Sequence, residues 1–259
     1  QPDRAQIRVG GRLWRARIGK RAGPRFHPPV VLVHGFGISS SYFVPMIERL
    51  EPEFDVYAPD LPGHGRSAAP PRALGIVELA DGLHEWLEAA GLPATSLVGH
   101  SMGCQVVVEL AVRYPAAADR LVLIGPTLDA QARSILRAAP RLLAGSGDER
   151  ASMIGLIARD YLRMAPRLLA EFRAMQSHRI EERLPRVAKP VLLVRGGNDR
   201  VAPQRWLDRL ERLTPDAGQA VVPDAGHAVQ YSAADRLVPL LTPFLRKTSM
   251  AAVERAKSE

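Results

Sequence analysis

The sequence predicts an α/β protein with one mostly parallel, eight-stranded sheet, flanking helices and a helical insertion. Three observations lead to this prediction. Short apolar runs alternate with amphipathic helical patterns, which is typical of parallel strands joined by right-handed crossovers. The stretch Gly99-His100-Ser101-Met102-Gly103 has the composition of a tight turn between a buried strand and a helix. From about residue 128 to 185, helical patterns continue while strand patterns stop.

The first half of the chain contains six candidate strands. Residues 7–9 and 13–18 alternate apolar and polar side chains around Gly10-Gly11, which predicts an antiparallel hairpin. The other four are short apolar runs, as expected of strands covered on both faces, at residues 30–33, 54–58, 97–98 and 121–124. Helical spacing of apolar residues predicts helices at about 39–50, 76–90 and 106–114.

The second half begins with the insertion. Helical patterns lie at about 135–143, 151–164 and 167–178, and we interpret them as an insertion between two strands of the same sheet. Strand and helix patterns then resume at 190–194, 206–213, 219–222 and 229–244. Pro239 and Pro243 are expected to kink or divide the last helix.

The expected organisation is therefore one core that is interrupted once. Residues 1–126 and 187–259 form the two parts of the core, and residues 127–186 form the insertion. A polar tail from about residue 247 is expected to fray.

Composition excludes several classes of protein. No apolar run approaches the roughly 18 residues that would span a bilayer, so we expect no membrane span. A cytoplasmic location is the simplest expectation, although the first residue is Gln1 and a removed leader stays open.

The lone cysteine, Cys104, cannot form an internal disulfide and is expected to be a small buried helix residue.

The net charge of +8 is concentrated at the start of the chain. Residues 1–30 contain eight Arg or Lys and one acid, Asp3, and arginine outnumbers lysine 31 to 4 overall, which indicates a codon bias. We expect these basic residues to be a solvated strand face and predict no nucleic-acid partner. A solvated face is also the expectation for the arginines of the insertion, Arg133, Arg137, Arg141, Arg159, Arg163, Arg167 and Arg173.

Ser101 is the candidate nucleophile. A strand-to-helix turn pushes its central residue towards a strained backbone conformation, and Gly99 and Gly103 remove the collisions that flanking Cβ atoms would cause. The serine would sit at the start of a helix, where free N–H groups favour developing negative charge.

A serine hydroxyl needs a base within hydrogen-bond reach and an acid to orient that base. Loops that follow parallel strands share one edge of the sheet, so partners should follow other strands. Asp199 and His227 do so. Asp129, after the preceding strand, and Asp224, close to His227 in sequence, remain alternative acids.

This order of Ser, Asp and His resembles that of the α/β-hydrolase family. The resemblance covers about residues 30–244 and includes His34-Gly35-Phe36-Gly37, the turn at 60–67, the serine turn, residues 196–203 and Gly226-His227. It implies that Ser101 is the nucleophile, His227 the general base and Asp199 the residue that orients it. It also implies an oxyanion hole formed by the backbone N–H groups of Phe36 and Met102, with the insertion as a helical cap.

The remaining histidines of these turns are expected to be structural. His34 would brace the oxyanion loop without transferring protons, and His64 and His100 would hold their own turns. No sequence pattern indicates a metal site or a phosphate loop, so we expect no metal and no cofactor.

The expected reaction is hydrolysis of a carboxylic ester of small or medium size through an acyl-enzyme on Ser101. The same core also fits a C–C bond hydrolase of the meta-cleavage-product type, a lactonase, a thioesterase or a perhydrolase. A non-catalytic, receptor-like binding protein is the alternative outside enzymes. Substrate-binding residues in the cap, and the choice between monomer and homodimer, stay unassigned.

Overall fold

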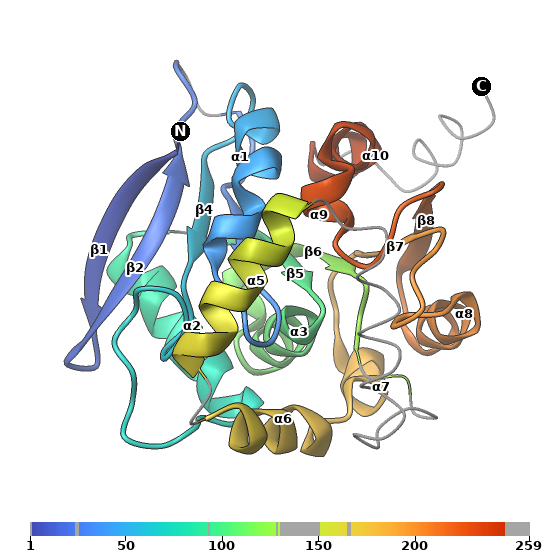
Figure 1. Ribbon diagram of the computed structural model, residues 1–259. Coiled ribbons are helices and arrows are strands. Elements are labelled where there is room, and N and C mark those ends of the chain that lie inside the picture. Colours follow the sequence, from blue (N-terminus) through green and yellow to red (C-terminus); the bar gives the residue numbers. More distant parts are fainter. Residues whose placement is uncertain are drawn as a thin grey trace.

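A computed structural model describes residues 2–23, 26–92, 94–127, 129, 151–164 and 167–246. Its centre is a twisted sheet with helices on both faces (Figure 1). The helix expected at 135–143 and the tail from residue 247 lie outside the described residues.

Eight strands form the sheet in the described part of the chain. They are β1 Asp3–Val9, β2 Arg12–Gly19, β3 Val30–Val33, β4 Val56–Pro59, β5 Thr95–His100, β6 Ala118–Ile124, β7 Val191–Gly196 and β8 Ala217–Val222. Their order across the sheet is β1-β2-β4-β3-β5-β6-β7-β8. Pairing is antiparallel between β1 and β2 and between β2 and β4, and parallel from β4 to β8. The predicted mostly parallel, eight-stranded sheet is confirmed.

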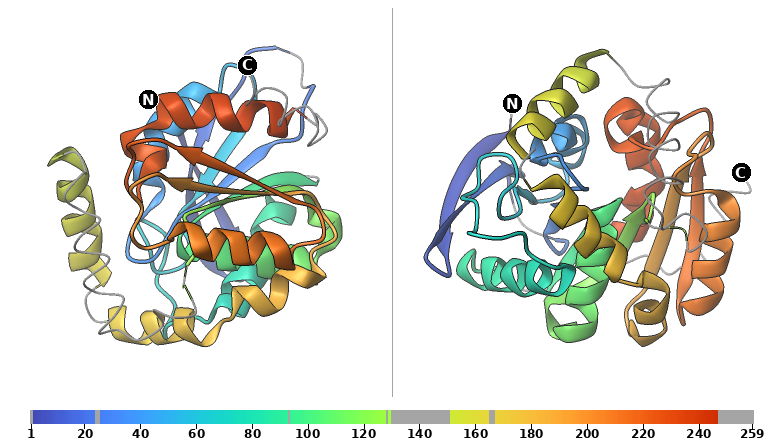
Figure 2. Two further views of the ribbon diagram at one scale, coloured as in Figure 1. Left: turned by 90° about the vertical axis from the view of Figure 1, so that its right-hand side faces the viewer. Right: turned by 60° about the horizontal axis from the view of Figure 1, so that its bottom comes forward.

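The helices of the core divide between the two faces of the sheet. One face carries α2 Ile76–Ala89, α3 Met102–Arg113 and α8 Gln204–Leu213, and the other carries α1 Val44–Leu50, α9 Val229–Ser232 and α10 Ala234–Leu245. Successive residues of the central strands point to opposite faces. Val31 and Val33 accordingly pack in the first cluster, and Val30 and Leu32 pack in the second. Figure 2 shows α8 and α10 on opposite sides of the sheet.

The first hairpin turns in two residues. Val9 pairs with Arg12, and the intervening Gly10 and Gly11 have φ of 52° and 76°. Positive φ at both positions matches a primed hairpin turn, whose twist suits the flanking strands. The hairpin is the one predicted from the sequence.

Two helices differ from prediction. The helix expected at 39–50 begins as a 3₁₀ helix, η1 Ser40–Phe43, and becomes α1 only around Pro45, which is favourable in a first turn. The last helix divides at Ala233, six residues before Pro239. Pro239 and Pro243 both lie inside α10, so the prolines do not divide the helix, and the alternative that they kink it stays a prediction. Pro239 is exposed and Pro243 half-buried, where water can bind the carbonyls that lose a donor.

Among the described residues, three α-helices follow β6 and precede β7, and we call them the inserted helices: α5 Ala151–Met164, α6 Leu168–Ser177 and α7 Ile180–Arg183. Two of them match the predicted spans at 151–164 and 167–178. The described residues between β6 and β7 contain no strand. In Figure 2, α5 lies outside the two helical layers, beyond one end of the strands.

Buried polar contacts join the inserted helices to the core. Ser39 Oγ donates to Asp160 Oδ2 of α5 at 2.6 Å, and His64 Nε2 lies 3.2 Å from Glu171 Oε2 of α6. On α3, the Gln105 amide donates to the carbonyl oxygens of Met175 and His178. These groups are buried, so a displacement of the helices would leave them without hydrogen bonds in an apolar environment.

None of the described helices combines the length and the apolar character needed to cross a membrane.

Candidate active site

Ser101 occupies a strained turn. It precedes the first residue of α3 with φ 55° and ψ −119°, and Asp224 is the only other non-glycine with positive φ in the described residues. A backbone of this kind costs about 1–3 kcal/mol and persists where the surroundings fix it. Here the Ser101 N–H donates to the carbonyl of Ile124 at 2.9 Å, and the Ser101 carbonyl accepts from Cys104 at 3.1 Å.

Close backbone packing explains the two glycines of the turn. A Cβ on Gly103 would lie 2.1 Å from the carbonyl oxygen of Val33, and a Cβ on Gly99 would lie 2.6 Å from the Gly103 carbonyl oxygen. The start of α3 therefore rests directly on the end of β3. No side chain fits between them, and this contact fixes the position of Ser101.

Asp199 and His227 form a hydrogen-bonded pair. Asp199 Oδ2 lies 2.9 Å from His227 Nδ1, while Oδ1 accepts the N–H groups of Val201 at 2.8 Å and Ala202 at 3.0 Å. Burial alone would raise the pKa of Asp199, but the neighbouring His227 and these hydrogen bonds outweigh it, and the pKa is lowered. The carboxylate is therefore ionised at neutral pH, with both oxygens occupied.

The alternative acids are placed elsewhere. Asp129 is buried and forms an ion pair with Arg205 of α8. Asp224 is exposed in the turn that leads to His227. Of the three aspartates considered from the sequence, the structure brings Asp199 to the imidazole.

Gly125 links the serine turn to the Asp199–His227 pair. It directly follows Ile124, whose carbonyl holds the Ser101 N–H. A Cβ on Gly125 would lie 2.9 Å from His227 Cε1 and 3.1 Å from Asp199 Oδ2. Among the described residues no hydrogen bond joins the Ser101 hydroxyl to the His227 ring. Such bonds are often long without substrate and shorten in the substrate complex.

A chain of hydrogen bonds connects three loops of the site. The Gly35 N–H donates to Tyr42 Oη at 3.0 Å, Tyr42 Oη lies 2.8 Å from His100 Nδ1, and His100 Nε2 lies 3.0 Å from the His227 carbonyl oxygen. A neutral imidazole fits this chain, with Nδ1 accepting the phenol proton and Nε2 donating. Burial, helped by His227, lowers the pKa of His100 to about 3. Sequence reasoning missed Tyr42, because a tyrosine inside an apolar helical stretch carries no local signal of this role.

His34 fixes the loop at residues 34–37. Its Nε2 accepts the Leu61 N–H at 2.9 Å, and its Nδ1 lies 2.9 Å from the Gly35 carbonyl oxygen. Burial, with a contribution from nearby His64, lowers the pKa of His34 to about 3. The neutral ring forms a hydrogen bond at each nitrogen, and it braces this loop as expected from the sequence.

The proposed oxyanion donors flank Ser101. Met102 is the first residue of α3, where N–H groups lack partners within the helix. Phe36 follows Gly35, at which a Cβ would lie 3.0 Å from Ser101 Cβ, so its loop adjoins the serine. The Phe36 ring meets Tyr161 of α5 and Phe172 of α6 edge-on, at centroid distances of 6.0 and 5.9 Å. The inserted helices thus cover this loop.

Cys104, one turn after Ser101, is buried as predicted. Its Sγ lies 3.2 Å from the Gly99 carbonyl oxygen and 3.4 Å from that of Ile124. Burial raises the pKa of the thiol well above its usual range. The thiol is therefore neutral and structural. In the part of the chain that the structure describes, no cluster of three or more His, Cys, Asp or Glu side chains could hold a metal ion.

Comparisons with known proteins agree with the observed fold. The model of the "Alpha/beta hydrolase family" matches residues 30–240. The chain belongs to the alpha/beta hydrolase family. A relative from Shigella flexneri serotype 5b (strain 8401), named "Putative carbamate hydrolase RutD", is 30% identical over 241 residues, covering 83% of this chain and 90% of the relative.

Solved structures of other alpha/beta hydrolases are also similar. A thermophilic esterase from Thermogutta terrifontis has a TM-score of 0.79 at 23% identity, covering 95% of this chain and 98% of the esterase. A meta-cleavage product hydrolase from Pseudomonas fluorescens IP01 has a TM-score of 0.74 at 23% identity, covering 93% of this chain and 96% of the other. At these identities the likeness shows the fold alone.

The packing of Gly103 in this alpha/beta hydrolase leads to a stability prediction. Gly103→Ala should lower the free energy of unfolding by at least about 3 kcal/mol or prevent folding, because the new methyl group meets the β3 backbone. Gly155→Ala, at an exposed position in α5 with no atom near the new Cβ, is the matched control and should be neutral or slightly stabilising. Urea unfolding measures both. Equal stability of the two variants would contradict the close contact.

The neutral His100 ring predicts a loss of stability in mild acid. An unfolded histidine binds a proton near pH 6.5, whereas folded His100, with a pKa of about 3, does not. The free energy of unfolding should therefore fall as the pH drops below about 6.5, by up to about 1.4 kcal/mol per pH unit from this residue. His100→Gln should lower the number of protons taken up on unfolding by about one, and so flatten the dependence of the free energy of unfolding on pH between pH 7 and 5. Urea unfolding at several pH values measures this dependence. An unchanged slope would show that His100 is already protonated when folded.

Proposed function

We propose that this alpha/beta hydrolase is a serine hydrolase that cleaves carboxylic esters of small or medium acyl groups through an acyl-enzyme on Ser101. One observation carries the proposal. The 2.9 Å pair of Asp199 and His227 adjoins the backbone at Gly125, next to the residue that anchors the serine turn. This arrangement supports the roles that we propose for Ser101 as nucleophile, His227 as base and Asp199 as orienting acid.

In the first half of the proposed reaction, Ser101 Oγ attacks the ester carbonyl carbon while His227 Nε2 takes its proton. The carbonyl oxygen becomes an oxyanion, which the N–H groups of Met102 and Phe36 stabilise. The tetrahedral intermediate then collapses: the bond to the alcohol oxygen breaks, and His227 returns its proton to that oxygen. Ser101 now carries the acyl group.

The second half repeats these steps with water. His227 removes a proton from the water, whose oxygen attacks the acyl carbon, and the carboxylic acid leaves as Ser101 is reprotonated. Asp199 stays ionised and stabilises the transient imidazolium through Nδ1. All these groups belong to the chain, so the proposed chemistry requires no metal or cofactor.

We further propose that residues 127–186 act as a cap that selects the substrate. The contacts of Tyr161 and Phe172 with Phe36 support this role, because they place inserted helices over the loop that would hold the oxyanion. Acyl groups would then fit between these helices and the ends of the strands, and the partner of the protein would be a small molecule.

Carbamate hydrolysis is a second candidate, favoured by the name of the relative that is 30% identical over 83% of this chain. The same site would attack a carbamate carbonyl through Ser101. Hydrolysis of a C–C bond in a vinylogous 1,5-diketone uses the same core and is the further alternative to test.

A substrate panel with Ser101→Ala tests the proposal. Wild-type protein should turn over p-nitrophenyl acetate or butyrate, and Ser101→Ala should lower kcat by at least about a thousandfold without a large change in melting temperature. A p-nitrophenyl carbamate and a vinylogous diketone complete the panel. If the protein turns over only the diketone or only the carbamate, that substrate class replaces the ester. If Ser101→Ala keeps wild-type activity, the mechanism through Ser101 is wrong. Binding without turnover of any substrate would favour a receptor-like role.

The choice of acid gives a second prediction. Asp199→Asn should lower kcat by about a thousandfold or more, because the amide cannot stabilise the imidazolium. Asp129→Asn removes a buried carboxylate of the same type and is the matched control. It should reduce thermal stability through its lost ion pair with Arg205 while kcat stays within about tenfold of wild type. Steady-state kinetics with the best ester measures both variants. If Asp129→Asn lowers kcat more than Asp199→Asn does, Asp129 is the orienting acid.

A further inference from the structure

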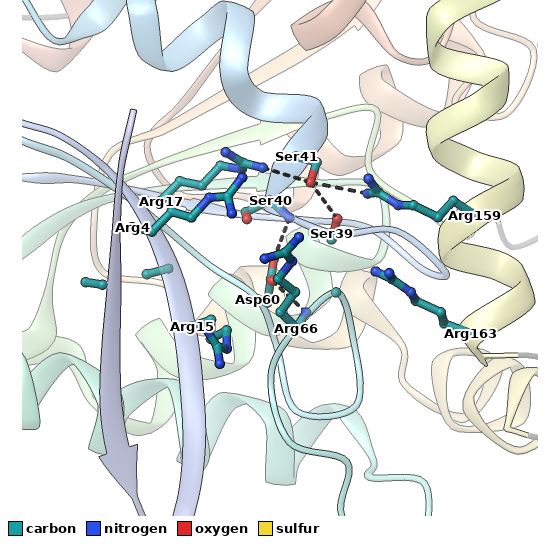
Figure 3. A pocket seen from close by; sticks show the side chains of 13 residues that line it. Arg4, Arg15, Arg17, Ser39, Ser40, Ser41, Asp60, Arg66, Arg159 and Arg163 are labelled. Atoms are coloured by element: carbon teal, nitrogen blue, oxygen red, sulfur yellow. Dashed lines mark hydrogen bonds between the residues drawn. The ribbon is translucent and has the colours of Figure 1, made fainter. Parts of the chain in front are cut away.

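A pocket lined by arginines lies where the inserted helices meet the first strands. We call it the arginine pocket. Its cations come from β1, β2, the turn at 60–67 and α5, and they are Arg4, Arg15, Arg17, Arg66, Arg159 and Arg163 (Figure 3). Ser39, Ser40, Ser41 and Asp60 complete its polar lining. The lining includes none of Ser101, Asp199 and His227, so the pocket is separate from the candidate active site.

Carboxylates do not balance these cations. Asp60, the one acid in the lining, accepts the backbone N–H groups of Ser40 at 2.8 Å and of Arg66 at 3.0 Å. Asp160, which is not part of the lining, accepts from Ser39 Oγ and from Arg159 Nε. Among the described residues, Arg159 is the one pocket arginine in an ion pair. The lining therefore holds six guanidinium groups and one carboxylate, and Arg159 alone of the six is paired with a second carboxylate, that of Asp160.

Arg17 shows the effect of this imbalance. Burial and then repulsion from Arg4 lower its pKa, with further repulsion from Arg159 and Arg66, although Asp60 opposes the shift. Its Nε is buried without a hydrogen-bond partner among the described residues. A bound anion would relieve the repulsion and could supply the missing acceptor.

The donors converge on one point. Arg17 Nη2 of β2 and Arg159 Nη2 of α5 donate to Ser41 Oγ from two directions, at 3.2 and 3.4 Å. Guanidinium forks and hydroxyl groups match the spacing of phosphate oxygens. The free volume of about 70 Å³ is several times the roughly 10–15 Å³ that one water needs.

We propose that the arginine pocket binds a phosphate-type oxyanion, either free phosphate or the terminal group of a small organic phosphate ester, and that the anion ties α5 to the β1–β2 hairpin. The concave shape favours a compact anion over an extended polymer. On α5, Tyr161 lies two residues after Arg159 and against the loop at residues 34–37, so an occupied pocket would also steady the helix over that loop.

The test uses the full chain and two phosphate probes. Inorganic phosphate and phenyl phosphate are titrated by calorimetry and by thermal melting, with sodium chloride at matched ionic strength and malonate as controls. Phosphate should bind saturably at millimolar concentration or tighter and raise the melting temperature. The tighter of the two phosphate probes identifies the free or the esterified anion. Equal stabilisation by chloride, or equal or tighter binding of malonate, would overturn the phosphate assignment.

Variants locate the site. Arg17→Gln with Arg159→Gln should weaken phosphate binding by about tenfold or more, because both forks are lost. Arg173→Gln, at an exposed α6 position outside the pocket, is the matched control and should leave binding unchanged. If the double variant fails to fold, Arg163→Gln at an exposed position of α5 replaces it, with the same direction expected. Undiminished phosphate affinity in the pocket variants would overturn the proposal.

The tie between α5 and the hairpin has its own readout. Hydrogen exchange of the α5 amides should slow when phosphate is added to wild-type protein and to Arg173→Gln, and not in the pocket variants. This measurement does not depend on hydrolysis, so it holds whether or not the ester assignment survives. Phosphate binding with no change in α5 exchange would overturn the tie.

Discussion

The rest of the site depends on one backbone contact. Gly103 lets the first turn of α3 rest on the end of β3, with no room for even a methyl group between them. The chain reverses sharply just before this contact, at Ser101, where φ is positive. The contact also places the loop after β3 beside the serine. The candidate nucleophile and its proposed oxyanion donors thus take their relative positions from main-chain packing.

Three histidines lie close together around this turn, and their surroundings differ. His34 and His100 are fully buried and bonded at both ring nitrogens, so they stay neutral and act as spacers between loops. His227 alone of the three has a carboxylate at Nδ1, from Asp199. Environment, and not residue type, therefore distinguishes a ring suited to carry a proton from two that hold the frame.

Most of the fold was predictable because its signals are local. Apolar runs and helical spacing placed the strands and most helices within a few residues, and Gly10-Gly11 identified the hairpin. The position of the break, Ala233, was not predictable, since no proline or glycine marks it in the sequence.

The site was predictable only in part. Chain order and strand ends selected Ser101, Asp199 and His227, but Asp129 stayed open because its partner, Arg205, lies 76 residues away. The same limit hid the arginine pocket. Arg17 and Arg159 each looked like part of a solvated face, and only the folded chain shows that they meet at Ser41. Contacts between segments that are distant in the chain produce no regular spacing of residues that could be recognised in the sequence.

The burial of Cys104 provides a natural probe of the serine turn. Its sulfur is sealed beneath the first turn of α3, and the sequence contains no other thiol to confuse the signal. An alkylating reagent can reach it only when that turn opens, so the rate of modification reports how often this segment unfolds on its own. The rate at which Cys104 is alkylated thus measures local unfolding in the part of the molecule on which the proposed hydrolysis would depend.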